Sequence, residues 1–162
     1  MSHAVLSLGA NLGDRLASLR AAVRALSEAV AVDAVSPVYE TAPVGGPDQP
    51  DYLNVVVLVT TSLTPLALLA LAHDVEDAAG RERNERWGPR TLDVDLIAYD
   101  AVVSSDPALT LPHPRAHERA FVLRPWLDVD PDAVLPGHGA VADLLATATG
   151  DVRRRDDLAV PA

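Results

Sequence analysis

The hydrophobic residues of this chain group into short continuous runs and longer periodic stretches, separated by polar segments. The short runs are typical of buried β-strands, and we expect strands at residues 3–8, 52–61 and 92–99. Residues 32–39 are a further strand candidate, in which Pro37 favours an edge position or a bulge because proline cannot donate a backbone hydrogen bond. Residues 109–113 are expected to form a short extended piece.

The longer stretches carry apolar residues at the spacing of one helix face. They predict helices over residues 16–30, 65–79 and 141–148, with a turn or short helix over roughly 115–125. Pro65 at the first helical position and Gly80 just past the last one mark the bounds of the second helix. The last dozen residues, which include Arg153, Arg154 and Arg155, are expected to be a tail or an edge strand.

The elements follow one another in the order strand, helix, strand, strand, helix, strand, which is the ferredoxin-like pattern. Several connections are short, so we expect an α+β fold with one largely antiparallel sheet and helices packed on it. The 162 residues contain no repeat and no linker, which predicts a single domain over residues 1–162. Residues 41–51 hold three prolines and two glycines, and a loop of that length is expected to be functional.

Composition excludes several classes of protein. Hydrophobic residues make up 49 % of the chain, which argues against disorder, and the absence of cysteine excludes a disulfide scaffold or a cysteine-ligated zinc site. No apolar run approaches the ~20 residues of a membrane span, and the N-terminus lacks a signal-peptide pattern, so a cytoplasmic protein without a membrane partner is expected. The net charge of −10 is opposite in sign to that of a general nucleic-acid binder.

All 13 basic residues are arginine. The absence of lysine excludes a Walker P-loop, which needs one. Any fixed cation in an anion site must therefore be an arginine, whose planar fork matches a phosphate.

Two aspartates, Asp93 and Asp95, alternate within the predicted strand at 92–99. Alternate strand residues share a face, so the two carboxylates project together with their Cβ atoms about 7 Å apart. Like charges at that separation repel one another unless a cation lies between them, and Mg²⁺ binds through one or two carboxylates plus substrate phosphates. The alternative is that both acids lie on a solvated face or pair with arginine.

Four arginines precede this strand within ten residues, namely Arg81, Arg83, Arg86 and Arg90. Cations for phosphates beside acids for magnesium are the components of a phosphoryl-transfer site. The alternative is that the arginines neutralise neighbouring acids such as Glu76 and Glu85. Trp87 among them is expected either to fill the core or to close over a flat ligand.

The segment RWGPRTLDVDLI at 86–97 closely resembles the signature of the 6-hydroxymethyl-7,8-dihydropterin pyrophosphokinase family of the folate pathway. Further segments resemble that family in the same order, at 7–15, 36–45, 49–57 and 111–123. The resemblance implies an α/β/α sandwich with a ferredoxin-like core and helices on both faces of the sheet. It also implies an enzyme that transfers pyrophosphate from ATP to 6-hydroxymethyl-7,8-dihydropterin with two Mg²⁺ ions, releasing AMP. A monomer is expected.

The resemblance implies roles for individual residues. It places the metal on Asp93 and Asp95, with Arg81 and Arg90 as catalytic partners. The residues it implies for the pterin are Gly9, Thr41, Ala42, Val44, Tyr52, Asn54, Trp87, Arg119 and Phe121. The residues it implies for the nucleotide are Glu76, Arg81, Arg83, Trp87, Arg90, Ile97 with the backbone of Leu96, His113 and Arg119.

The chemistry of a pterin agrees with several of these roles. A flat ring with donors and acceptors on its rim suits an aromatic face such as Phe121 and an amide such as Asn54. Gly9 would let the backbone approach the ring. Structural alternatives remain, since Tyr52 and Phe121 could be ordinary core residues and Asn54 could satisfy backbone groups. The other histidines are expected to be structural, at positions 3, 73, 117 and 138.

Three features depart from the family pattern. Ala42 stands where the family often has proline, Pro114 follows His113 where some members carry an aromatic residue, and only two residues separate Arg83 from Arg86. No strong general base is evident. The competing hypotheses are a phosphotransferase that acts on another alcohol, a non-catalytic pterin- or nucleotide-binding protein, and a purely structural ferredoxin-like module.

Overall fold

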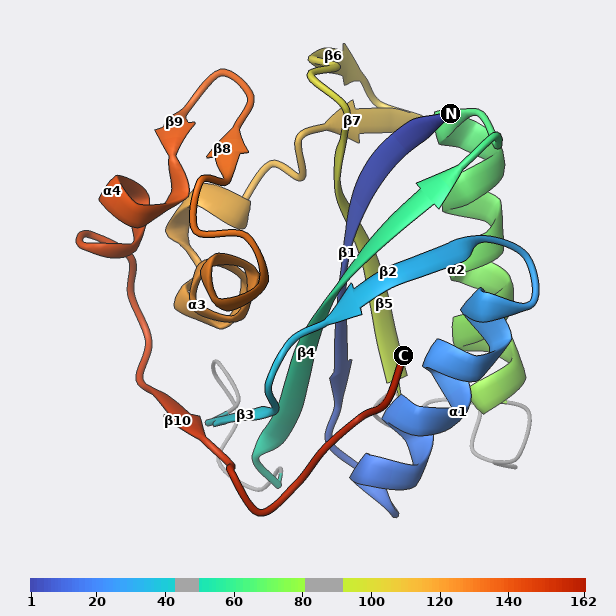
Figure 1. Ribbon diagram of the computed structural model, residues 1–162, viewed down its shortest axis with the longest axis vertical. Helices are drawn as coiled ribbons and strands as arrows, with labels where there is room; N and C mark the ends of the chain where they lie inside the picture. The colour runs from blue at the N-terminus through green and yellow to red at the C-terminus, as the bar shows by residue number, and fades with distance from the viewer. Residues whose placement is uncertain (43–49, 81–91) are drawn as a thin grey trace.

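A six-stranded antiparallel sheet forms the middle of the molecule in the computed structural model, which describes residues 1–42, 50–80 and 92–162. The order along the sheet is β10–β3–β4–β1–β5, and β2 pairs with β4 beside β3 (Figure 1). The strands of this sheet are β1 (Ser2–Ala10), β2 (Ala31–Val35), β3 (Tyr39–Thr41), β4 (Tyr52–Thr61), β5 (Leu92–Tyr99) and β10 (Val152–Arg154). The ferredoxin-like arrangement and the largely antiparallel sheet are thus confirmed.

Helices pack on both faces of this sheet. Helices α1 (Arg15–Ser27) and α2 (Pro65–Gly80) lie on one side, and α3 (Ala120–Val129) lies on the other, with the short α4 (Val141–Leu145) against it (Figure 1). Side chains cap the N-termini of α1 and α2: the Asp14 carboxylate accepts the Ala17 N–H at 3.0 Å, and the Thr64 hydroxyl accepts the Ala67 N–H at 3.2 Å. Such caps satisfy backbone donors that the first turn leaves without partners.

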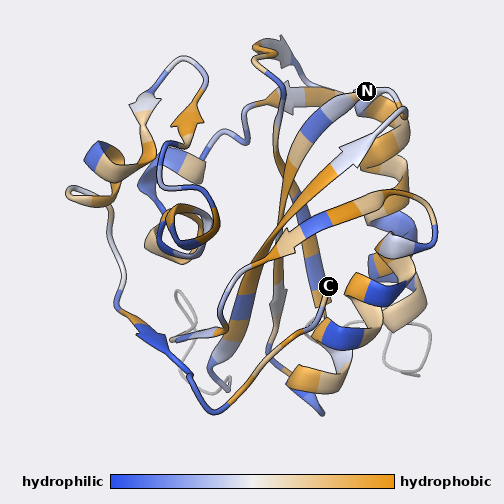
Figure 2. Cartoon of the chain, viewed as in Figure 1, coloured by the Kyte–Doolittle hydropathy of each residue, from blue (hydrophilic) through white to orange (hydrophobic). Residues whose placement is uncertain are grey.

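Two hydrophobic clusters separate the layers. The larger one joins the sheet to α1 and α2 and includes Leu6, Leu8, Leu19, Leu26, Leu53, Val55, Leu68 and Val94. The smaller one joins the opposite face to α3 and includes Val5, Val56, Ile97, Val122, Leu123 and Trp126. Figure 2 shows the middle of β4 in hydrophobic orange and β10 in hydrophilic blue. The members of the two clusters show that successive residues of β4 point alternately to the two faces of the sheet, as the strand period requires.

Strands β4 and β5 have the bounds that the sequence predicts, but the region around Pro37 does not. The predicted strand at 32–39 is two strands, β2 and β3, separated at residues 36–38. The Ser36 hydroxyl accepts the Val56 N–H at 2.9 Å and donates to the Pro37 carbonyl at 2.9 Å. A side chain thus takes over a ladder bond of β4 where the chain bends.

Short elements complete the chain. These are the β6 (Ser104–Asp106) and β7 (Leu109–Leu111) hairpin, a single turn of 3₁₀ helix (Ala116–Glu118), and the β8 (Val134–Leu135) and β9 (Gly139–Ala140) hairpin. Helix α3 extends beyond the turn or short helix expected at 115–125, with Pro125 buried inside it. Within the described ranges, no helix is long and apolar enough to cross a bilayer.

Candidate active site

One end of the sheet carries a row of small and polar residues on the face that holds α3. Gly9 in β1 pairs with Asn54 in β4 on one side and with Asp93 in β5 on the other. Thr41 in β3 pairs with Tyr52, two residues before Asn54. Directly paired residues, and residues two apart in one strand, share a face. The sheet therefore brings these five positions together, although they come from four strands.

Gly9 leaves space that its two neighbours use. A Cβ atom at this position would lie 2.9 Å from Asn54 Oδ1 and 3.4 Å from Tyr52 Cδ1. The first distance is shorter than real Cβ contacts, so any larger residue would displace the Asn54 amide. The requirement for glycine here follows from packing alone, before any ligand is considered.

Asn54 is held in one orientation. Its side chain is buried, with 3 % of the residue exposed, and its Nδ2 donates to the buried Thr41 hydroxyl at 2.8 Å. An amide carries two N–H donors and an acceptor oxygen, so this bond does not exhaust what Asn54 offers a ligand. Burial raises the pKa of half-buried Tyr52, and the negative charge of the Asp93 carboxylate raises it further. The Tyr52 hydroxyl therefore lies within the electrostatic field of Asp93.

Asp93 and Asp95 project from β5 on the side facing α3, as the strand period predicts. Both are half-buried, whereas Leu92, Val94 and Leu96 between them are buried against the helices α1 and α2. Asp95 pairs with Ser7, next to the Gly9 row. Among the described residues, no group of three or more histidines or acids is placed to hold a metal.

Glu76 reaches β5 from α2. Its Oε2 accepts the Val94 N–H at 3.0 Å, which satisfies an outward-facing donor of this edge strand. The bond ties the end of α2 to the residue between the two aspartates. Glu76 thus lies on the open edge of β5 rather than in the Gly9 row.

A cleft of about 330 Å³ runs along this edge, between α2, β5 and the β6–β7 hairpin. Five of the residues that line it are positions predicted for metal or nucleotide, namely Glu76, Asp93, Asp95, Leu96 and His113. The others include Leu69 and Thr110, for which the sequence predicts no role, and His73, which was expected to be structural. Because the β6–β7 hairpin carries no motif, only the tertiary fold shows that it forms a wall of the cleft.

His113 and Arg119 adjoin the acids. The backbone N–H of His113 donates to the Ile97 carbonyl at 2.9 Å, and the His113 Nδ1 accepts the Arg115 backbone N–H at 3.2 Å, which orients the ring beside the cleft. Burial is the main cause that lowers the pKa of His113; Arg119 and Arg115 lower it further, and Asp95 opposes them. The imidazole is therefore neutral at pH 7 and lies within the fields of both an acid and an arginine.

Arg119 also meets Phe121 at the start of α3. The guanidinium carbon lies 5.4 Å from the centre of the Phe121 ring, a cation–π arrangement. Phe121 is partly buried against the smaller hydrophobic cluster. Arg119 thus lies near both His113 and Phe121, the one phenylalanine of the chain.

The remaining predicted positions have mixed placements. Ile97 is buried in the smaller cluster, with 1 % exposed, and the cleft is lined by the preceding Leu96 instead. Ala42 is exposed just after β3. Five predicted residues lie outside the described part of the chain, namely Val44, Arg81, Arg83, Trp87 and Arg90.

Comparison with known proteins gives a consistent result. The 7,8-dihydro-6-hydroxymethylpterin-pyrophosphokinase (HPPK) family profile matches residues 5–131. A 2-amino-4-hydroxy-6-hydroxymethyldihydropteridine pyrophosphokinase from Mycobacterium leprae is 51 % identical over 150 residues, covering 86 % of this chain and 78 % of that protein. A protein of the same name from Bacillus subtilis is 45 % identical over 128 residues, covering 78 % of this chain and 77 % of that one.

Solved structures agree in fold. The wild-type HPPK-DHPS of Plasmodium falciparum with pteroate superposes with a TM-score of 0.71 at 15 % identity, covering 90 % of this chain. This chain spans 42 % of that longer one. An HPPK-DHPS in complex with substrates gives a TM-score of 0.70 at 13 % identity, over 90 % of this chain and 43 % of that one. At such identities the likeness concerns the fold.

Proposed function

Because this chain belongs to the 7,8-dihydro-6-hydroxymethylpterin-pyrophosphokinase family, we propose that its active site is the end of the sheet where Asp93 meets Gly9 and Asn54. The reaction of the family is transfer of pyrophosphate from ATP to hydroxymethyldihydropterin in folate biosynthesis. The single observation that carries the assignment is the pairing of Gly9, since it puts a metal-type acid and a buried amide on either side of one glycine.

The donor set of β5 fits magnesium. Asp93 and Asp95 are half-buried carboxylates on one face of one strand, and hard cations such as Mg²⁺ prefer a few carboxylates completed by phosphate oxygens. We therefore assign two Mg²⁺ ions to these residues in the nucleotide-bound enzyme. Bound there, the ions would neutralise phosphate charge as it shifts during transfer.

The cleft along β5 is the proposed place for ATP. It opens beside both aspartates and is bounded by Glu76 and neutral His113, so a nucleotide there would have its phosphates at the acids. Arg119 would face the transferred group from the start of α3. On the grounds of sequence, we add the phosphate and loop contacts of Arg81, Arg83, Trp87 and Arg90, and a backbone contact near Ile97.

The pterin is proposed to lie over the Gly9 row. Asn54 would bond the polar rim of the ring, since Thr41 already fixes its orientation. Tyr52 and Gly9 would form the floor, and Phe121 would contribute its ring face. Ala42 and Val44 belong to this pocket on the grounds of sequence.

The chemistry is an in-line displacement at phosphorus. The hydroxymethyl oxygen of the pterin attacks the β-phosphorus of ATP, the bond from that phosphorus to the oxygen bridging it to the α-phosphorus breaks, and AMP leaves with the bridging oxygen. The hydroxyl proton passes to solvent. This chain would contribute alignment of the two substrates and a fixed electrostatic environment.

A direct assay tests the proposal. AMP is expected to form from ATP only when both Mg²⁺ and 6-hydroxymethyl-7,8-dihydropterin are present. AMP formation with other alcohols but not with the pterin would indicate a different phosphotransferase. Tight binding of both ligands without any AMP would indicate a binding protein. We also expect the protein to be cytoplasmic and monomeric. Light scattering of the purified chain would check the monomeric state.

A further inference from the structure

The basic tail of the chain is an integral strand of the sheet. Strand β10 pairs antiparallel with β3, with Val152 opposite Thr41, Arg153 opposite Glu40 and Arg154 opposite Tyr39. Residues 152–154 lie beyond residues 5–131, the part of the chain that matches the family. The three-residue β3 is thereby held on both sides, by β4 and by β10.

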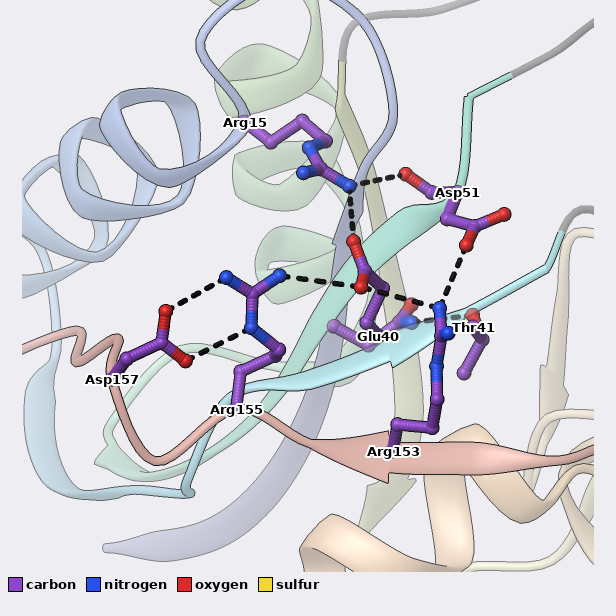
Figure 3. Close-up of polar contacts among 8 residues, drawn as sticks. Arg15, Glu40, Thr41, Asp51, Arg153, Arg155 and Asp157 are labelled. Atoms are coloured by element: carbon purple, nitrogen blue, oxygen red, sulfur yellow. Dashed lines mark hydrogen bonds and ion pairs between the residues drawn. The ribbon is translucent and has the colours of Figure 1, made fainter.

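Glu40 is the centre of an ionic network on the opposite face of β3 from Thr41 (Figure 3). Its carboxylate accepts from Arg15 at 2.8 Å, from Arg153 at 3.2 Å and from Arg155 at 3.2 Å. The Glu40 side chain is only 15 % exposed, which limits the screening of its bonds to half-buried Arg15 and Arg155, whereas Arg153 is exposed and its bond is screened more strongly. The hydrogen bond from Arg15, aided by the charges of the other two arginines, lowers the pKa of Glu40.

The same network holds the start of β4. Arg153 donates to the Asp51 carboxylate at 2.8 Å, and Arg15 donates to the Asp51 carbonyl at 2.8 Å. Arg155 is itself fixed by Asp157 through two bonds, at 2.8 Å and 2.9 Å. Figure 3 shows how these side chains converge from β10, β3 and the start of α1.

Two acidic residues of the network, Glu40 and Asp51, directly precede residues of the proposed pterin site in the sequence. Glu40 precedes Thr41, and Asp51 precedes Tyr52. Thr41 and Tyr52 face each other across the ladder, and Thr41 orients Asn54. The spacing between the Thr41 hydroxyl and the Asn54 amide therefore depends on how firmly the ionic network on the opposite face of the sheet holds β3 and β4.

We propose that Arg153 and Arg155 are positioning residues for the pterin: through Glu40 and Asp51 they fix the ends of β3 and β4 that carry Thr41, Tyr52 and Asn54. The inference rests on the proposed function, because it takes that row of residues to be the pterin site. It assigns a role in substrate recognition to two arginines that contact Glu40 on the opposite face of β3 from Thr41.

The test compares two variants of one strand. In the variant Arg153→Gln/Arg155→Gln, the KM for the pterin is expected to rise about fivefold, since part-buried ion pairs contribute modestly, while kcat and the KM for ATP stay within about twofold. The matched control is Arg154→Gln, whose side chain pairs with the exposed Asp156 and takes no part in the network. Arg153→Lys/Arg155→Lys keeps both charges and is expected to recover most of the affinity.

Pterin binding to protein loaded with Mg²⁺ and α,β-methylene-ATP, which cannot release AMP, separates this inference from the proposed function. Wild-type protein that binds no pterin would overturn both. Wild-type protein that binds it, with the double variant equal to Arg154→Gln, would overturn the inference alone. Equal loss of affinity for both ligands would also overturn it, because that is the result of general unfolding. The milder Glu40→Gln, which keeps both arginines, is expected to weaken pterin binding in the same selective way.

Discussion

At the scale of single residues, the site depends on a side chain that is missing. Gly9 has no Cβ, and the space goes to the Asn54 amide and the Tyr52 ring. Asn54 cannot swing aside freely, because it is buried and donates to Thr41. A small change at Gly9 is therefore transmitted to the residue that we expect to read the pterin.

We predict that Gly9→Ala raises the KM for the pterin about tenfold or more and lowers the free energy of unfolding by about 1–3 kcal/mol, because the new methyl group overpacks the site. Kinetics for each substrate and urea unfolding measure the two effects. Gly9→Ala/Asn54→Ala serves as the control, since removing the amide relieves the clash. Its loss of stability should be smaller than the sum of the single losses, and strict additivity would contradict this explanation.

A second prediction concerns the paired acids. Asp93→Asn and Asp95→Asn are each expected to reduce kcat by about 10³-fold, since metal-ion stabilisation is worth several kcal/mol. Binding of the pterin alone should change little. For Asp95→Asn, stability in the absence of metal should hold or rise, because its charge no longer repels that of Asp93. The exposed α2 residue Asp77, changed to Asn, should leave all three measurements unchanged; near-normal turnover of Asp95→Asn would exclude the metal assignment.

The sequence predicts these residues unevenly, for a physical reason. The shared face of Asp93 and Asp95 follows from the strand period, which local geometry sets. Their neighbours do not follow from the period: the proximity of His113 and Arg119 depends on where the chain returns after the β6–β7 hairpin. The motif resemblance predicts those two residues, whereas it predicts no role for Thr110, and His73 in the cleft wall was expected to be structural.

At the scale of elements, β3 is the shortest of the four strands that carry the site, and several contacts hold it. It has three residues, and both neighbouring strands and an ionic network hold it. Its hydroxyl contact across the layers, from Tyr39 to the Asp128 carboxylate of α3, ties it to the helix that carries Phe121. Burial and that carboxylate together raise the pKa of Tyr39.

The depressed pKa of Glu40 predicts how acid acts on this strand. A carboxyl whose pKa is lower in the folded chain than its ordinary value of 4.5 stabilises the fold fully above that value. The contribution is lost as the pH falls through the lowered folded-state pKa. Wild type should therefore exceed Glu40→Gln in unfolding free energy at pH 7, and the gap should close in acid. A gap that stays constant with pH would contradict this role of the charge.

Removing one hydroxyl should test the link between the layers. Tyr39→Phe leaves the Asp128 carboxylate with Arg124, which donates to it at 2.7 Å, and is expected to cost about 1 kcal/mol of stability. Chemical unfolding measures this loss. Ser36→Ala removes the hydroxyl that accepts the Val56 N–H at the other end of the same bend, so it provides a comparison of similar size. A stability equal to that of wild type would show that the contact to α3 carries no energy.

Element boundaries could be predicted where a strand or helix has its own strong pattern. The bounds of β4 and β5 follow from continuous apolar runs flanked by loop residues. The hairpins β6–β7 and β8–β9 have strands of two or three residues, whose formation depends on their partners and gives no periodic signal. Helix α3 continues past Pro125 because Trp126 still packs on the sheet.

At the scale of the whole molecule, the two hydrophobic clusters lie on opposite faces of the sheet, and the proposed site lies at one end of it. We expect one cooperative unfolding transition, as is usual for a domain of this size. The magnesium complex of α,β-methylene-ATP at about 100 times its Kd should add about 2.7 kcal/mol to the stability. Asp95→Asn should lose this gain in calorimetry, and an undiminished gain would place the nucleotide elsewhere.

The outer edge of β5 has a consequence for how copies of this chain meet. Exposed edge strands offer free backbone groups that recruit other strands and start aggregation. Here the Val94 N–H is taken by Glu76 and the Ile97 carbonyl by the His113 N–H. Two carboxylates beside that edge would also repel the same edge of a second molecule. The residues that line the proposed ATP cleft thus also disfavour edge-to-edge pairing of two molecules through β5. The cleft therefore reduces the tendency of the protein to aggregate.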